Sequence, residues 1–164
     1  MRYISAFTFM LLSAAAATPP EHAALAAVHS TPIPNSPVTF RSYRAALREA
    51  RAQHKPVLLL FTNPHCGPCR ALESLVLADP IGSSVVAAGY VPVRLTARLA
   101  ADDLLTAEEA QLSKQFGIAG VPRVVVLNSQ GREVARFGWS SKQEVLQLLR
   151  VHAGAPPERA PVAA

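Results

Sequence analysis

A chain of 164 residues, 50% of them apolar, is long enough for one domain with an ordinary hydrophobic core, so its fold needs neither a metal nor a disulfide for stability. Its net charge of +5 comes from scattered lysines and arginines, without basic runs or interleaved aromatic residues. This pattern argues against nucleic-acid binding.

The N-terminal residues have the features of a secretory signal peptide. Arg2 precedes an apolar run over residues 3–12, which is followed by small residues with several A-x-A cleavage choices. We expect removal of residues 1–17, or of as many as 27 residues. The run is short for a spanning helix, which needs about 20 residues, and an uncleaved N-terminal membrane anchor is the competing interpretation. The mature protein is therefore expected to be periplasmic or otherwise exported, where thiols are not kept reduced by default.

Composition divides the remaining chain into three parts. Residues 18–37 are rich in proline and alanine, which is typical of an extended linker. Residues 153–164 show no apolar periodicity and are expected to be disordered. The folded domain is expected over residues 38–152.

Helical and extended patterns alternate within this domain. The first expected elements are a helix from Tyr43 that ends before Pro56, a strand at 57–62, a helix starting around the cysteines and a strand at 91–96. A helix at 104–116 follows, with Leu105, Leu112 and Phe116 facing inward. The last elements are a hairpin of strands 124–127 and 133–137 and a closing helix through Val145 and His152. Strand 57–62 is uniformly apolar, as in a strand buried on both faces, whereas Pro92 cannot donate to a strand ladder and places its strand at a sheet edge. This order predicts an α/β fold with a parallel core, an antiparallel hairpin edge and helices on both faces.

Both cysteines of the chain lie in the tetrapeptide Cys66-Gly67-Pro68-Cys69, where the apolar strand passes into a helix. At a helix N-terminus the unpaired N–H groups and the macrodipole lower the pKa of a thiol, so Cys66 is the expected nucleophile and Cys69, one turn later, is more shielded. Gly67 lets a partner's backbone approach closely, and Pro68 fixes φ in the first turn without losing a hydrogen bond. The pair is thus suited to reversible disulfide formation.

Two other uses of the cysteines are open at this point. A structural disulfide across so short a loop removes little entropy from the denatured chain, which disfavours that interpretation. The alternative function is a copper- or zinc-binding module that uses His65, Cys66 and Cys69. A closed structural zinc site needs four ligands, however, and the chain has no second cysteine pair.

The tetrapeptide after an apolar strand, followed by Gly120-Val121-Pro122 before another strand, resembles the thioredoxin superfamily over residues 38–152. Within it, Glu73, the Asp79-Pro80 pair and residues 93–133 most resemble the C-terminal periplasmic domain of the transmembrane thiol:disulfide interchange reductase. The resemblance implies a thioredoxin fold, with a central mixed four-stranded sheet and helices on both faces. It also implies thiol–disulfide oxidoreductase activity, with no cofactor beyond the redox-active Cys66–Cys69 disulfide and with no metal.

The same resemblance implies the roles of the site residues. Cys66 attacks a substrate disulfide and Cys69 resolves the mixed disulfide. Pro122 is implied to be cis, which places the backbone of Val121 opposite the cysteines, where it can pair with a substrate segment. His65, Gly67 and Pro68 adjoin this substrate-binding surface.

The expected partners follow from the reaction. They are protein disulfides or dithiols as substrates and a membrane-embedded reductase as electron donor, and we expect a monomer. The Gly-Pro pair between the cysteines is that of thioredoxin, whose potential of about −270 mV favours a reductase.

Two positions depart from the family pattern. His65 stands where the family often has tryptophan: as an imidazolium it would stabilise the Cys66 thiolate, and as a neutral ring it would only cover the site. Leu60 replaces the family's buried acid, which assists proton transfer to the second cysteine. Glu73, at i+4 from Cys69, is the remaining candidate for that transfer, or else a solvated helix carboxylate.

Overall fold

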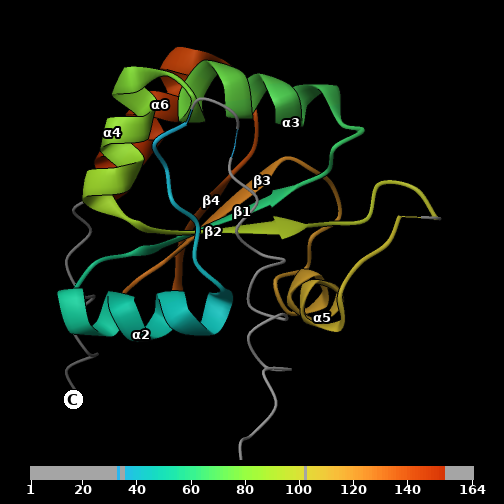
Figure 1. The fold of residues 1–164 in the computed structure, drawn as a ribbon, viewed down its shortest axis with the longest axis horizontal. Helices are drawn as coiled ribbons and strands as arrows, with labels where there is room; N and C mark the ends of the chain where they lie inside the picture. The colour runs from blue at the N-terminus through green and yellow to red at the C-terminus, as the bar shows by residue number, and fades with distance from the viewer. Residues whose placement is uncertain (1–32, 34–35, 102, 154–164) are drawn as a thin grey trace, which may run out of the picture.

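The computed structural model of the chain describes residue 33, residues 36–101 and residues 103–153 (Figure 1). The expected signal peptide and most of the expected linker and tail lie outside these residues. Ile33 belongs to the expected linker but is buried in the hydrophobic core, so core contacts begin before residue 38. Within the described residues no single helix is long and apolar enough to cross a membrane. Only when the two segments Gly67–Leu77 and Pro80–Gly89, which meet at a bend, are taken together do they have that length and hydrophobicity.

A mixed four-stranded sheet in the order β2-β1-β3-β4 forms the centre of the domain, which confirms the expected α/β fold. β1 (Val57–Thr62) pairs in parallel with β2 (Val91–Thr96) and antiparallel with β3 (Arg123–Leu127), and β3 forms a hairpin with β4 (Glu133–Phe137). The parallel part is therefore limited to β1 and β2, since β3 runs opposite to β1. β2 lies at a sheet edge, as Pro92 predicts.

Helices cover both faces of the sheet (Figure 1). On one face lie α2 (Tyr43–Gln53) and α5 (Ala107–Gln115); on the other lie α3 (Gly67–Leu72), the π-helical segment η1 (Glu73–Leu77), α4 (Pro80–Gly89) and α6 (Lys142–His152). α5 begins at Ala107 rather than at Leu104 because Thr106 and Glu109 form a capping box. Leu105 therefore precedes the helix and is only half-buried, whereas Leu112 and Phe116 are buried as expected.

Alternate residues of β1 supply two separate hydrophobic layers. Leu58 and Leu60 pack in the layer under α3, α4 and α6, and Val57, Leu59 and Phe61 pack in the layer under α2 and α5. All five side chains are at most 1% exposed. This explains why the strand is apolar from Val57 to Phe61 and why its end, where Cys66 follows, is held firmly in place.

Candidate active site

Cys66 and Cys69 form a disulfide at the start of α3, just beyond the end of β1. Cys66 is the N-cap residue of the helix, with an extended backbone, and its Sγ accepts a hydrogen bond of 3.2 Å from the backbone N–H of Cys69. Cys66 is 5% exposed and Cys69 is 1% exposed. The N–H that points at Sγ of Cys66 would stabilise a thiolate on that sulfur in the reduced protein, whereas Cys69 is almost completely buried.

The loop before β3 lies against the same cysteine. The peptide bond between Val121 and Pro122 is cis, the isomer that the family resemblance implies. The carbonyl oxygen of Val121 lies 3.6 Å from Sγ of Cys66, and Pro122 is buried. The structure thus brings the backbone of Val121 next to the expected nucleophile, although the two residues are far apart in the sequence.

Three residues expected at the substrate surface surround the buried Cys66. His65, Gly67 and Pro68 are all exposed. The backbone N–H of His65 donates to Oδ1 of Asn63 (2.9 Å), which fixes the turn that leads into the tetrapeptide. The His65 ring lines a pocket described below and makes no hydrogen bond within the described part of the chain. The surface next to Cys66 is thus formed by residues that are open to solvent.

Glu73 is a paired, mostly buried carboxylate and not a solvated one. Its Oε1 accepts hydrogen bonds from Oγ1 of Thr62 (2.9 Å) and from Nη2 and Nε of Arg94 (2.9 and 3.2 Å). The Glu73 side chain is 16% exposed and that of Arg94 24%. This oxygen therefore accepts three hydrogen bonds from two residues. The expected part of Glu73 in proton transfer to Cys69 stays a prediction.

Leu60 makes the strand side of the site apolar. It is 1% exposed, lies in the same core cluster as Leu72 of α3, and pairs across the sheet with Arg94. Sequence reasoning missed Thr62 and Arg94. The sequence contained a signal for both residues. Thr62 is two residues after Leu60 and so lies on the same face of β1. Arg94 is a charged residue in a mostly apolar strand, and such a residue needs a partner when it is buried.

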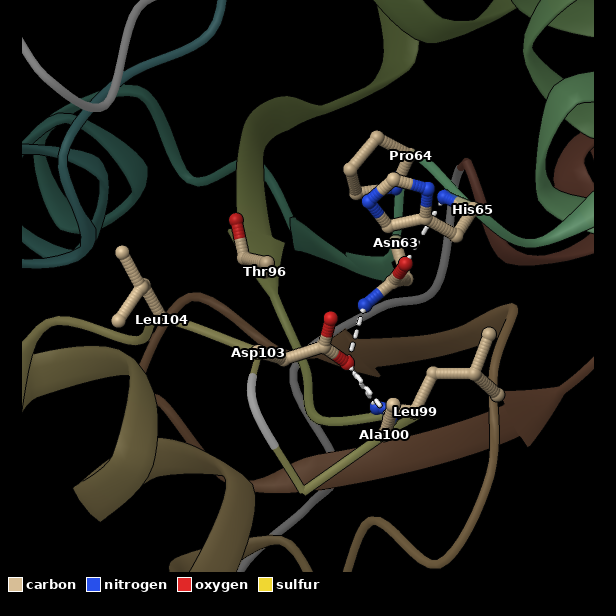
Figure 2. Close-up of a pocket in the computed structure, with 8 residues that line it drawn as sticks. All are labelled: Asn63, Pro64, His65, Thr96, Leu99, Ala100, Asp103 and Leu104. Carbon is tan, nitrogen blue, oxygen red and sulfur yellow. Dashed lines mark hydrogen bonds between the residues drawn. The ribbon is translucent and has the colours of Figure 1, made fainter.

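A pocket of about 530 Å³ opens beside the site, and no sequence motif pointed to it. It lies between the residues just before Cys66 and the loop after β2, as Figure 2 shows. In this pocket Oδ2 of Asp103 accepts hydrogen bonds from the backbone N–H groups of Leu99 (2.6 Å) and Ala100 (2.7 Å) and from Nδ2 of Asn63 (2.9 Å). The bonds from Ala100 and Leu99, followed by that from Asn63, hold the pKa of Asp103 below its ordinary value.

The candidate metal ligands are His65, Cys66 and Cys69. The two cysteines are joined in a disulfide, and His65 is next to Cys66 in the chain. Within residues 33, 36–101 and 103–153, which include His65, Cys66 and Cys69, no group of three His, Cys, Asp or Glu side chains is arranged to hold a metal ion. No observation on these residues favours the metal-binding alternative.

Comparisons with known proteins agree with this geometry. A family model of thioredoxin-like domains matches residues 43–153. The solved structure of an oxidoreductase named DsbH superposes with a TM-score of 0.60 at 20% identity, covering 76% of this chain and 92% of that one. A thioredoxin from Thermus thermophilus has a TM-score of 0.56 at 30% identity, covering 67% and 82% of the two chains.

A third solved structure bears on the expected branch. The oxidised C-terminal domain of DsbD from Neisseria meningitidis has a TM-score of 0.53 at 24% identity, covering 66% of this chain and 91% of that one. At this identity the likeness concerns the fold. The family model confirms the expected thioredoxin-like family, and the fold is also shared with this domain.

The Glu73–Arg94 contact predicts a measurable effect on stability. Arg94→Met should lower the free energy of unfolding by about 1–3 kcal/mol, because a mostly buried carboxylate loses two of its three donors. The matched control is Arg41→Met, which removes the partner of Glu49 in a more exposed pair and should cost less than about 1 kcal/mol. Urea denaturation of both variants gives the comparison.

A double variant shows whether the unpaired charge is the cause. Glu73→Gln should cost less in the Arg94→Met background than in the wild type, since the amide needs no cation. Equal costs in the two backgrounds would contradict the role of the ion pair.

Proposed function

Because the chain belongs to the thioredoxin-like family, we propose that it is an exported oxidoreductase that reduces disulfide bonds in other proteins. Thiol–disulfide exchange as the reaction class follows from family membership and from the Cys66–Cys69 disulfide. The direction of the reaction, the export and the roles of individual residues are the proposal. The observation that carries it is the position of a buried cysteine pair at a helix start, against the carbonyl of Val121.

In the reducing direction the thiolate of Cys66 attacks one sulfur of a substrate disulfide. The substrate S–S bond breaks, its other sulfur leaves as a thiolate, and Cys66 is joined to the substrate in a mixed disulfide. The thiolate of Cys69 then attacks the sulfur of Cys66, so the second substrate sulfur leaves and the Cys66–Cys69 bond forms. Two electrons pass to the substrate, and the N–H of Cys69 stabilises charge on Cys66.

The loop before β3 is proposed to hold the substrate chain. The carbonyl oxygen of Val121 is next to Cys66, and the exposed Gly67 leaves room for a second backbone. Apart from its chain neighbours and its own helix backbone, no atom lies within 4 Å of the position that a Cβ would take there. An extended substrate segment could therefore pair with the backbone of Val121 while its cysteine reaches Cys66. Such pairing uses main-chain groups and does not depend on the substrate's side chains.

An electron donor is a necessary part of the proposal. Each turnover leaves Cys66 and Cys69 oxidised, and outside the cytosol thiols are not kept reduced by default. A membrane-embedded reductase that passes electrons to this dithiol is the partner that meets this requirement.

The proposed division of labour is tested by trapping. Cys69→Ser should accumulate mixed disulfides with other proteins, because attack by Cys66 proceeds and resolution does not. Cys66→Ser should accumulate almost none, since Cys69 is 1% exposed. Non-reducing gels and mass spectrometry give the result, and equal trapping by the two variants would remove the assignment of Cys66 as nucleophile.

The direction is tested by the reduction potential of the Cys66–Cys69 couple. Equilibration in redox buffers, followed by alkylation of free thiols and mass measurement, gives this value. A potential of about −270 mV, as in thioredoxin, supports a reductase. A potential of about −120 mV, as in a strong oxidant, would reverse the proposed direction.

Export is tested on protein from its native cell envelope. N-terminal sequencing should find a first residue between Thr18 and Val28, because the order of Arg2, apolar run and small residues predicts cleavage there. An intact Met1 on membrane-bound protein would show an anchor instead of a cleaved signal.

A further inference from the structure

The pocket beside the active site is lined by the residues that directly precede the reactive cysteine. One wall comes from Pro64 and His65, which directly precede Cys66, and the other from the loop after β2 with Leu99, Asp103 and Leu104 (Figure 2). A polypeptide whose cysteine is bonded to Cys66 therefore lies next to this pocket. Its volume of about 530 Å³ can hold a long side chain of such a polypeptide.

The rim of the pocket carries apolar side chains that the domain itself does not cover. Leu104 is 93% exposed and Leu99 is 52% exposed. Single exposed leucines are common, but here two lie beside a reactive cysteine, together with the exposed ring of Pro64. Contact with an aliphatic chain would remove this surface from water.

The pocket contains the carboxylate of Asp103, and only one of its two oxygens accepts the hydrogen bonds described above. Oδ2 of Asp103 already accepts three hydrogen bonds, from Leu99, Ala100 and Asn63. Figure 2 shows the second carboxylate oxygen on the side away from the N–H groups of Leu99 and Ala100, towards the space between Thr96 and His65, with no hydrogen bond to the residues drawn. The backbone N–H groups fix the carboxylate in place, so its free oxygen is a ready acceptor for a cationic donor.

We propose that this pocket binds a basic side chain, arginine or lysine, that lies close to the reactive cysteine of the substrate. The aliphatic stem packs on Leu99, Leu104 and Pro64, and the cationic end donates to Oδ1 of Asp103. The planar group of an arginine can also stack on the His65 ring. The inference rests on the proposed thiol–disulfide exchange and specifies which substrates that exchange favours.

Other side chains fit the pocket less well. An acidic side chain would bring a second negative charge to Asp103, and a purely apolar one would take the carboxylate out of water without giving it a partner. Arg98, a cation on the same loop, donates to the carbonyl oxygen of Ala101 and is not among the residues that line the pocket. The carboxylate thus remains available to a cation from the substrate.

The test uses short peptides with one cysteine activated as a mixed disulfide with thionitrobenzoate. Attack by Cys66 on the peptide sulfur forms a mixed disulfide and releases the coloured thionitrobenzoate thiolate. Arginine, norleucine or glutamate is placed at each of the two positions before and after the cysteine. With the reduced full-length chain at low salt, at least one position should show release about fivefold faster for arginine than for norleucine, and slower release for glutamate.

Asp103→Asn examines the carboxylate itself. The amide oxygen can still accept from the loop N–H groups, while an NH₂ group replaces the free oxygen, so the arginine-to-norleucine ratio should fall to about one. Each ratio is taken within one variant, which cancels any general change in Cys66 reactivity. The matched control Glu133→Gln removes an exposed carboxylate at the opposite end of the sheet and should keep the wild-type ratio.

The outcomes separate the pocket from the proposed function. Equal rates for arginine and norleucine at all four positions in the wild type would overturn the pocket assignment, although release itself would still show exchange. A preference that persists in Asp103→Asn would also overturn it. Absence of release from every peptide would overturn the proposed function and the pocket assignment together.

Discussion

The pairing of β1 with two neighbours that run in opposite directions determines where everything else in the site lies. β2 is parallel to β1, so the loop after β2 lies at the end of β1 where Cys66 follows. β3 is antiparallel to β1, so the loop before β3, with Val121 and Pro122, lies at the same end. The disulfide, the cis proline loop and the pocket therefore meet because of one buried strand, and none of them could be moved without changing its register.

The same strand decides where polar chemistry can occur beneath the cysteines. Leu60 and Thr62 lie on one face of β1; Leu60 contributes to the apolar core, and two residues later the hydroxyl of Thr62 donates to Glu73. Arg94, which pairs with Leu60 from the neighbouring strand β2, also donates to the Glu73 carboxylate. With leucine in the strand, the acidic group nearest in sequence to Cys69 is on the helix, and it is tied to a cation. The predicted proton route to Cys69 would therefore start from the helix and not from the strand.

The sequence predicted those features that follow from local patterns. Examples are the apolar run of β1, the proline in β2 and the cysteines at a helix start. In each case the local structure depends on residues that are close together in the sequence. The sequence patterns predicted a larger parallel core than the β1–β2 pair that is observed. The direction of β3 depends on its pairing with β1 and cannot be read from the residues of β3 itself. The start of α5 was placed early because Leu104 continues the helical pattern, while the capping box at Thr106 decides the boundary. The Asp103 pocket needed the loop to fold back on Asn63, a contact between distant parts of the chain.

The two sides of Cys66 differ in what they can recognise. The side of Val121 offers a backbone carbonyl, which can serve any extended polypeptide whatever its side chains. The side of Asp103 offers a fixed carboxylate and exposed leucines, which distinguish one side chain from another. A contact between exposed charges changes a rate by only about fivefold, so the proposed contact with Asp103 would rank substrates without excluding any of them. Broad reactivity and a moderate preference can thus coexist in one small site, because a backbone contact at Val121 and the proposed side-chain contact at Asp103 involve different residues.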